Sequence, residues 1–144
     1  MFRLPTIKFW RNTGLIVLLL CICFTLLGTF GISGPIAYRW GAAVEPNAFG
    51  GRWVLWAMLV LSVLSLFAAA SFTKPKPGQR AVSKETASAL AIGLMSIFTG
   101  VDIILVLYAF YPLPAVPIAG TIGVFLAFVL YLLIAAWREK HGPR

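Results

Sequence analysis

The sequence predicts an all-α membrane protein in which four transmembrane helices form two antiparallel hairpins. The chain has 144 residues, of which 60% are hydrophobic and 11% charged, and its mean hydropathy is +0.94. A soluble domain carries about 25% charged residues, so this chain has too much apolar surface to dissolve in water. Four long apolar runs and basic clusters at their ends complete the prediction. We expect one domain, residues 1–144.

Each apolar run is long enough to cross a bilayer, which takes about 20 helical residues for about 30 Å of hydrocarbon. The expected helices are 14–33, 53–72, 86–111 and 115–137. The first two contain no charged residue, the third contains Asp102, and Arg138 follows the fourth. The first run exceeds the roughly 7–15 apolar residues of a signal peptide, so we expect it to be retained as a helix.

Three connectors join these helices. Residues 34–52 form an extracytoplasmic loop, and residues 111–117 form a tight turn. Residues 73–85 form a short basic linker with Pro75, Pro77 and Gly78, which predicts a stiff spacer without a fold of its own.

The positions of the basic residues predict the orientation. All of the 12 lysines and arginines except Arg39 and Arg52 lie in the two tails and the 73–85 linker. The positive-inside rule therefore places both termini in the cytoplasm, and we expect a bacterial inner (cytoplasmic) membrane. The net charge of +8 comes from basic clusters that flank the apolar runs. Because these residues form no basic stripe along a soluble face, we expect no binding of nucleic acid.

Asp102 is the one acid inside an expected transmembrane helix, and Thr99 and Ser96 precede it on nearly the same face. An acid at this depth is costly unless it is paired, protonated or in contact with water. One interpretation is a proton or cation site at Asp102, Thr99 and Ser96. The other is an uncharged Asp102 that is hydrogen-bonded to Thr99 or to another helix.

Small residues recur every fourth position on the last two helices. Ala119, Gly123 and Ala127 share one face of the fourth helix, and the third helix has the pairs Ala89–Gly93 and Ser96–Gly100. Such faces allow close helix packing in lipid. We expect packing within the bundle in preference to a homodimer contact.

The residues of hydrolytic, phosphate-binding or metal-binding sites do not occur in a recognisable arrangement. Cys21 and Cys23 project from opposite sides of the first helix and are expected to be apolar fillers, and the single histidine, His141, lies in the charged tail. We therefore predict a protein that is not an enzyme and that needs neither a metal nor a cofactor.

The extracytoplasmic loop carries the candidate binding residues. Its tryptophans suit the headgroup layer of a membrane, and its arginines can contact lipid phosphates or Glu45. The binding candidates are Arg39, Trp40, Glu45, Asn47 and Arg52.

The spacing of this loop resembles that of an uncharacterised bacterial membrane domain family, which is shared with SdpI-type toxin-immunity proteins. The family pattern runs roughly I-P-x-H-W-N-x-x-G-x-x-D-x-x-G-S-K-W. The residues that match it are Ile36, Trp40, Gly50 and Trp53, while Asn47, Gly51 and Arg52 replace its acid, serine and lysine. The departures are Ala37, Arg39, Gly41 and Val44. The resemblance implies a membrane domain with this helical layout. If the chain is like the immunity proteins, it would sequester or block another membrane-active molecule.

Three functions remain open. The first is a non-enzymatic membrane protein that binds a partner, a peptide toxin or lipid through its extracytoplasmic loop. The second is a small accessory subunit of a larger membrane complex. The third is a small proton-coupled transporter that uses Asp102.

Overall fold

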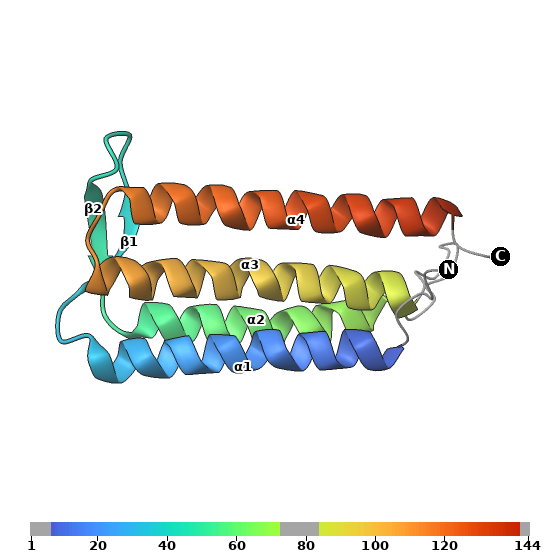
Figure 1. The fold of residues 1–144 in the computed structure, drawn as a ribbon. Coiled ribbons are helices and arrows are strands. Elements are labelled where there is room, and N and C mark those ends of the chain that lie inside the picture. Colours follow the sequence, from blue (N-terminus) through green and yellow to red (C-terminus); the bar gives the residue numbers. More distant parts are fainter. Residues whose placement is uncertain (1–6, 73–83, 142–144) are drawn as a thin grey trace.

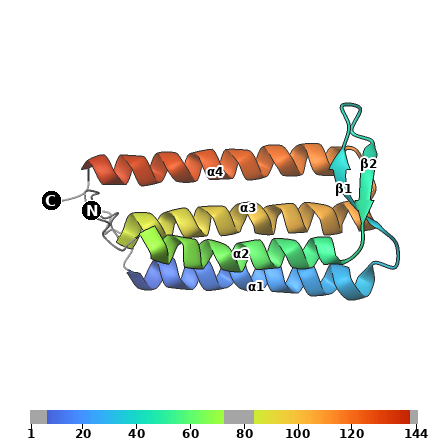
Figure 2. The same cartoon turned by 180° about the vertical axis from the view of Figure 1, so that it is seen from behind.

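Four helices lie side by side in the computed structural model, with a small two-stranded sheet at one end (Figure 1). The structure describes residues 7–72 and 84–141. The helices are α1 (Ile7–Gly31), α2 (Trp53–Phe72), α3 (Lys84–Phe110) and α4 (Ala115–His141). Successive helices run in opposite directions, so α1 begins and α4 ends at the end away from the sheet (Figure 2).

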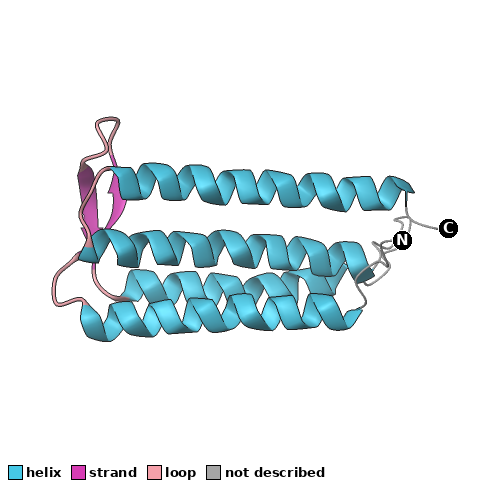
Figure 3. Cartoon of the chain, viewed as in Figure 1, coloured by secondary structure: helices cyan, strands magenta, loops and turns pink. Residues whose placement is uncertain are grey.

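The prediction of four helices is confirmed, and the all-α class needs one correction. Strands β1 (Ile36–Trp40) and β2 (Pro46–Gly50) occupy the segment that was expected to be an irregular loop (Figure 3). The predicted 73–85 linker lies outside the described residues except for its last two, which begin α3. Among the basic residues of the two tails, Arg3 and Arg144 lie outside the described residues, whereas Lys8 and Arg11 lie in α1 and Arg138 and Lys140 lie in α4.

Three helices in the described residues are long and apolar enough to cross a membrane. These are the segments Asn12–Gly31, Thr86–Phe110 and Ala115–Leu133. The remaining helix, α2, is apolar over Trp53–Ala68. Large apolar side chains such as Phe67, Phe125 and Leu133 are about two-thirds exposed, and lipid is the solvent in which such a surface is favourable. The length and apolar composition of its helices therefore indicate a membrane protein.

Helix α3 is the centre of the packing. It contacts α1, α2 and α4, whereas α4 packs mainly against α3. Two glycines bring α3 and α4 together, because Gly100 faces Val124 and Gly120 faces Ile104 so closely that a Cβ atom would lie within 2.4 Å and 2.5 Å of those side chains. The two helices can approach this closely because glycine has no side chain at these contacts.

The small-residue stripe predicted on α4 does not make this contact. Ala119, Gly123 and Ala127 are exposed, and a Cβ atom at Gly123 would have no described atom within 4 Å. The face of α4 toward α3 lies one position further along the helix, at Gly120 and Val124. The predicted packing of this stripe within the bundle is therefore wrong for the monomer. On α3, Gly93 and Gly100 do face α4, at Tyr131 and Val124.

The sheet continues the helical core at one end of the bundle. A buried apolar cluster joins α1, β1, α2 and α3 there, and it consists of Ile32, Ile36, Val54, Leu55, Leu105 and Val106. Since Ile36 of β1 is fully buried in this cluster, the sheet is part of the fold.

The two strands form an antiparallel hairpin with an irregular register. Ile36 pairs with Gly50 and Trp40 with Pro46, and the register shifts on either side of Arg39. At the tip, the amide of Gly41 donates to the carbonyl of Glu45, and Val44 adopts a left-handed conformation with φ of 60°. Such a conformation is uncommon for a β-branched residue, so the surrounding hairpin must hold it.

Candidate functional site

Asp102 is completely buried between three helices. Its Oδ2 atom accepts a hydrogen bond of 2.9 Å from Oγ1 of Thr25, which is also fully buried on α1. The alternative in which Asp102 bonds to another helix therefore agrees with the structure. A hydrogen bond between transmembrane helices contributes about 0.6–2 kcal/mol.

Cys21 and Ser62 extend this polar contact to α2. The thiol of Cys21 lies 3.9 Å from Oδ2 of Asp102 and 3.6 Å from the hydroxyl of Ser62, and both side chains are fully buried. Cys21 therefore makes polar contacts and is more than the apolar filler expected, whereas Cys23 is exposed on the opposite side. We call Cys21, Thr25, Ser62, Thr99 and Asp102 the Asp102 centre.

Two buried oxygens of the Asp102 centre lack a hydrogen-bond partner among the described residues. They are Oδ1 of Asp102 and Oγ1 of Thr99, which lie three residues apart on α3. Buried polar oxygens are normally hydrogen-bonded to protein or to ordered water. The Asp102 centre can thus accept further hydrogen bonds or hold one small polar species.

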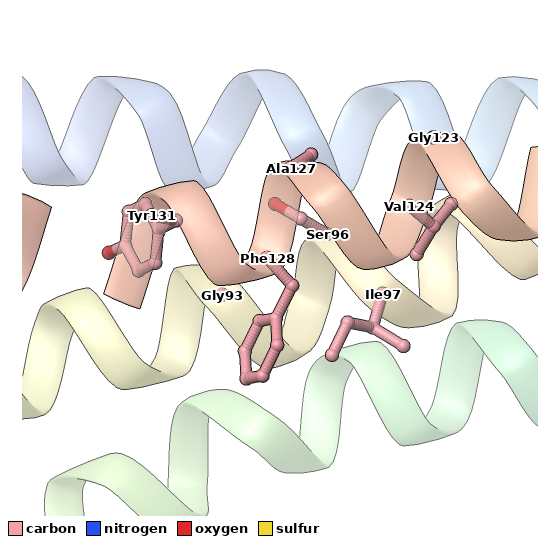
Figure 4. A pocket seen from close by; sticks show the side chains of 8 residues that line it. All are labelled: Gly93, Ser96, Ile97, Gly123, Val124, Ala127, Phe128 and Tyr131. Carbon is pink, nitrogen blue, oxygen red and sulfur yellow. The ribbon is translucent and has the colours of Figure 1, made fainter. Parts of the chain in front are cut away.

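Ser96 does not belong to the Asp102 centre, in contrast to the prediction. Its hydroxyl donates to the carbonyl of Ile92 over 2.7 Å, and the side chain lies in a groove between α3 and α4 (Figure 4). The groove has a volume of about 360 Å³. Its lining is almost entirely apolar: Gly93, Ile97, Gly123, Val124, Ala127, Phe128 and Tyr131, with Ser96. In a bilayer, such a groove offers packing surface and little polar chemistry.

The hairpin is fixed to the bundle by aromatic and charged contacts. The rings of Trp40 and Tyr108 meet edge to face with centroids 5.4 Å apart, which joins β1 to α3. The ring centroids of Tyr38 and of Trp53, at the start of α2, lie 6.4 Å apart. Nη2 of Arg52 donates to the carbonyl of Ile32 over 3.1 Å, just beyond the C-terminus of α1.

The predicted loop residues therefore divide into two groups. In the first group, Trp40 is half-buried against Tyr108 and Arg52 donates to the carbonyl of Ile32, so both residues attach the hairpin to the bundle. Arg39, Glu45 and Asn47 are exposed on the hairpin. Three aromatic residues beside them are also exposed: Tyr38 by 44%, Phe49 by 56% and Trp53 by 64% of their surface. A guanidinium, an amide and aromatic rings together suit an amphipathic partner at a membrane surface.

Sequence reasoning missed three members of the Asp102 centre: Cys21, Thr25 and Ser62. The sequence carried a partial signal, because Cys21, Thr25 and Thr29 recur every fourth residue and so share one face of α1. Which helix would face them could not be read from this spacing.

No group of three or more His, Cys, Asp or Glu side chains that could hold a metal ion occurs in the described part of the chain. Comparisons with protein-family models, with curated proteins and with solved structures give no match for this chain.

Proposed function

We propose that this chain is a non-enzymatic integral membrane protein that binds a partner at the membrane surface through its β-hairpin. The partner would be amphipathic, such as a peptide or a lipid with an anionic group. The observation that supports this proposal is the division of the hairpin into anchored and exposed residues. Trp40 and Arg52 hold it on the bundle, while Arg39 and Asn47 stay exposed.

In the proposed topology, this hairpin lies on the extracytoplasmic side of the membrane. The four helices span a bacterial inner membrane as two hairpins, with both termini cytoplasmic. The basic residues of the tails and the linker favour this orientation. The hairpin then lies on the periplasmic side, where its aromatic rings reach the headgroup layer.

An anchored recognition element has a binding advantage over an irregular loop. An irregular loop must lose backbone freedom when it binds, which costs about 1–2 kcal/mol for each residue that is fixed. The hydrogen-bonded strands and the Trp40–Tyr108 contact order the backbone of the hairpin in advance and so lower this cost. The resemblance of residues 36–53 to the toxin-immunity family supports a role in sequestering a membrane-active molecule.

Site-specific photo-crosslinking in intact cells tests this function. A photoreactive residue at Asn47 should give a discrete peptide or lipid adduct, and the yield should fall several-fold when Arg39→Ala is added. The same photoreactive residue at Thr121, which is exposed on α4, is the matched control. Equal adducts from both positions, or no effect of Arg39→Ala, would reject binding by the hairpin.

A second candidate function is that of an accessory subunit in a larger membrane complex. The observation in its favour is that α4 packs mainly against α3 and leaves Ile122, Phe125 and Leu126 more than half exposed. Purification in a mild detergent separates the candidates. A stoichiometric membrane partner would favour the subunit, whereas a monomer or a homodimer would count against it.

A further inference from the structure

We propose that the Asp102 centre binds one exchangeable proton on the carboxyl group of Asp102, and that this proton exchanges with water on the hairpin side of the membrane. The site lies apart from the surface that the proposed function uses. It would also supply what a proton-coupled transporter needs.

The Asp102 carboxyl group has no basic residue to balance a negative charge. The sequence places no Lys, Arg or His within residues 14–31, 53–72 or 86–110, which are the apolar parts of the three packed helices. Lys8 and Arg11 of α1 and Lys84 of α3 lie at the ends of these helices away from the hairpin. A lone carboxylate in hydrocarbon is strongly unfavourable. The remaining ways to satisfy the group are a proton, or water that enters from one side.

The groups that face Asp102 are otherwise uncharged. Helix α1 presents the hydroxyl of Thr25 and the thiol of Cys21, a titratable group whose sulfur lies 3.9 Å from Oδ2 of Asp102. Helix α2 contributes the hydroxyl of Ser62 through Cys21, and α3 contributes that of Thr99. On β1, which also packs against α3, Arg39 is exposed. Helix α4 packs against α3 as well, and its residues 115–133 include no Asp, Glu, Lys, Arg or His.

The Asp102 centre has a place for the proton and for its acceptor. Because Thr25 already donates to Oδ2, a proton on Oδ1 leaves both oxygens of the carboxyl group in hydrogen-bonding roles. Oγ1 of Thr99 also has no partner among the described residues, so one buried water could join it to the proton on Oδ1.

The hairpin side offers the shorter path to water. Asp102 lies eight residues before the end of α3 at Phe110, which corresponds to about 12 Å along the helix. The other end, at Lys84, is about 27 Å away. Thr25 and Thr29 continue the polar face of α1 toward the hairpin, whereas buried Ala87, Ala91 and Met95 occupy α3 toward the far end.

A tight apolar contact closes the short path. At Gly28, between Thr25 and Thr29, a Cβ atom would lie 2.4 Å from Cδ1 of Leu55 and 2.9 Å from Cγ2 of Val106. These two side chains separate the Asp102 centre from the hairpin. Proton exchange therefore requires Leu55 and Val106 to move away from Gly28, so exchange should be gated there.

The chain offers a direct probe because Asp102 is its only aspartate. Cell-free synthesis with ¹³C-labelled aspartate marks this carboxyl group alone, and isotope-difference infrared spectroscopy then reports its protonation without any substitution. The full chain is inserted in vesicles in one orientation, and the pH is varied on one side at a time between acidic and strongly alkaline values.

The expected result is a protonated carboxyl band at acidic pH that is largely lost when the hairpin side is made alkaline. The same change on the opposite side should leave the band in place. Thr99→Val should shift the frequency of the band, and Thr121→Val on exposed α4 should not. A band that never titrates, a carboxylate band at every pH, or loss of the band from the opposite side alone would each overturn the proposal.

Discussion

Oγ1 of Thr25 lies 2.9 Å from Oδ2 of Asp102, and this contact joins α1 to α3 where neither side chain has any exposed surface. Thr25→Val keeps the shape of the side chain and removes the donor. We expect it to lower the free energy of unfolding in detergent by about 1 kcal/mol, because a buried acceptor loses its partner. Thr121→Val, on the exposed face of α4, should leave stability unchanged. Equal stability of the two variants would show that the bond does not stabilise the bundle.

The two faces of α4 should respond differently to a large side chain. Gly120→Leu forces carbon atoms into Ile104 of α3, whereas Gly123→Leu points into open space. We expect a loss of about 1–3 kcal/mol for Gly120→Leu and almost none for Gly123→Leu. Thermal unfolding of both variants in the same detergent measures the difference. If Gly123→Leu proved the more harmful, the stripe Ala119, Gly123 and Ala127 would be a packing surface after all.

The Trp40–Tyr108 contact should control the mobility of the hairpin. Trp40→Ala removes the ring that packs edge to face on α3, so the tip at residues 41–45 should be cleaved several-fold faster by a protease. Phe49→Ala on the partner strand removes a ring that is 56% exposed, and it should change cleavage little. Indistinguishable cleavage rates would mean that the ring pair does not anchor the sheet.

Arg39 and Arg52 should separate binding from stability. Arg52→Gln loses the hydrogen bond to the carbonyl of Ile32, and we expect a stability loss of about 1 kcal/mol. Arg39→Gln, at an exposed position, should leave thermal unfolding unchanged while it weakens the crosslink from Asn47. Stability and crosslinking measured on the same two variants test this division, and the reverse pattern would contradict it.

The sequence predicted the number of helices because each helix corresponds to a continuous apolar run of residues. The length of an apolar run and the prolines and glycines after it gave bounds close to Ile7–Gly31, Trp53–Phe72, Lys84–Phe110 and Ala115–His141 at most ends. The early start of α1 and the late end of α4 were missed because polar residues extend both helices beyond their apolar runs.

The hairpin and the Asp102 centre were harder to predict because both depend on contacts between distant residues. The strands form only by pairing Ile36 with Gly50 and Trp40 with Pro46, and glycine and proline there suggested a plain loop. Asp102 stood out as an intramembrane acid. Its partner Thr25, 77 residues earlier in the chain, depends on which faces of α1 and α3 meet.

Cysteine accessibility across the membrane tests the central claim most directly, namely that the hairpin and the chain ends lie on opposite sides of a bilayer. In a chain with Cys21→Ser and Cys23→Ser, single cysteines are placed at Asn47 on the hairpin and at His141 at the end of α4. A membrane-impermeant maleimide should label position 47 in intact cells and position 141 only after the membrane is opened. Labelling of position 141 in intact cells, or of position 47 only in opened ones, would contradict the account.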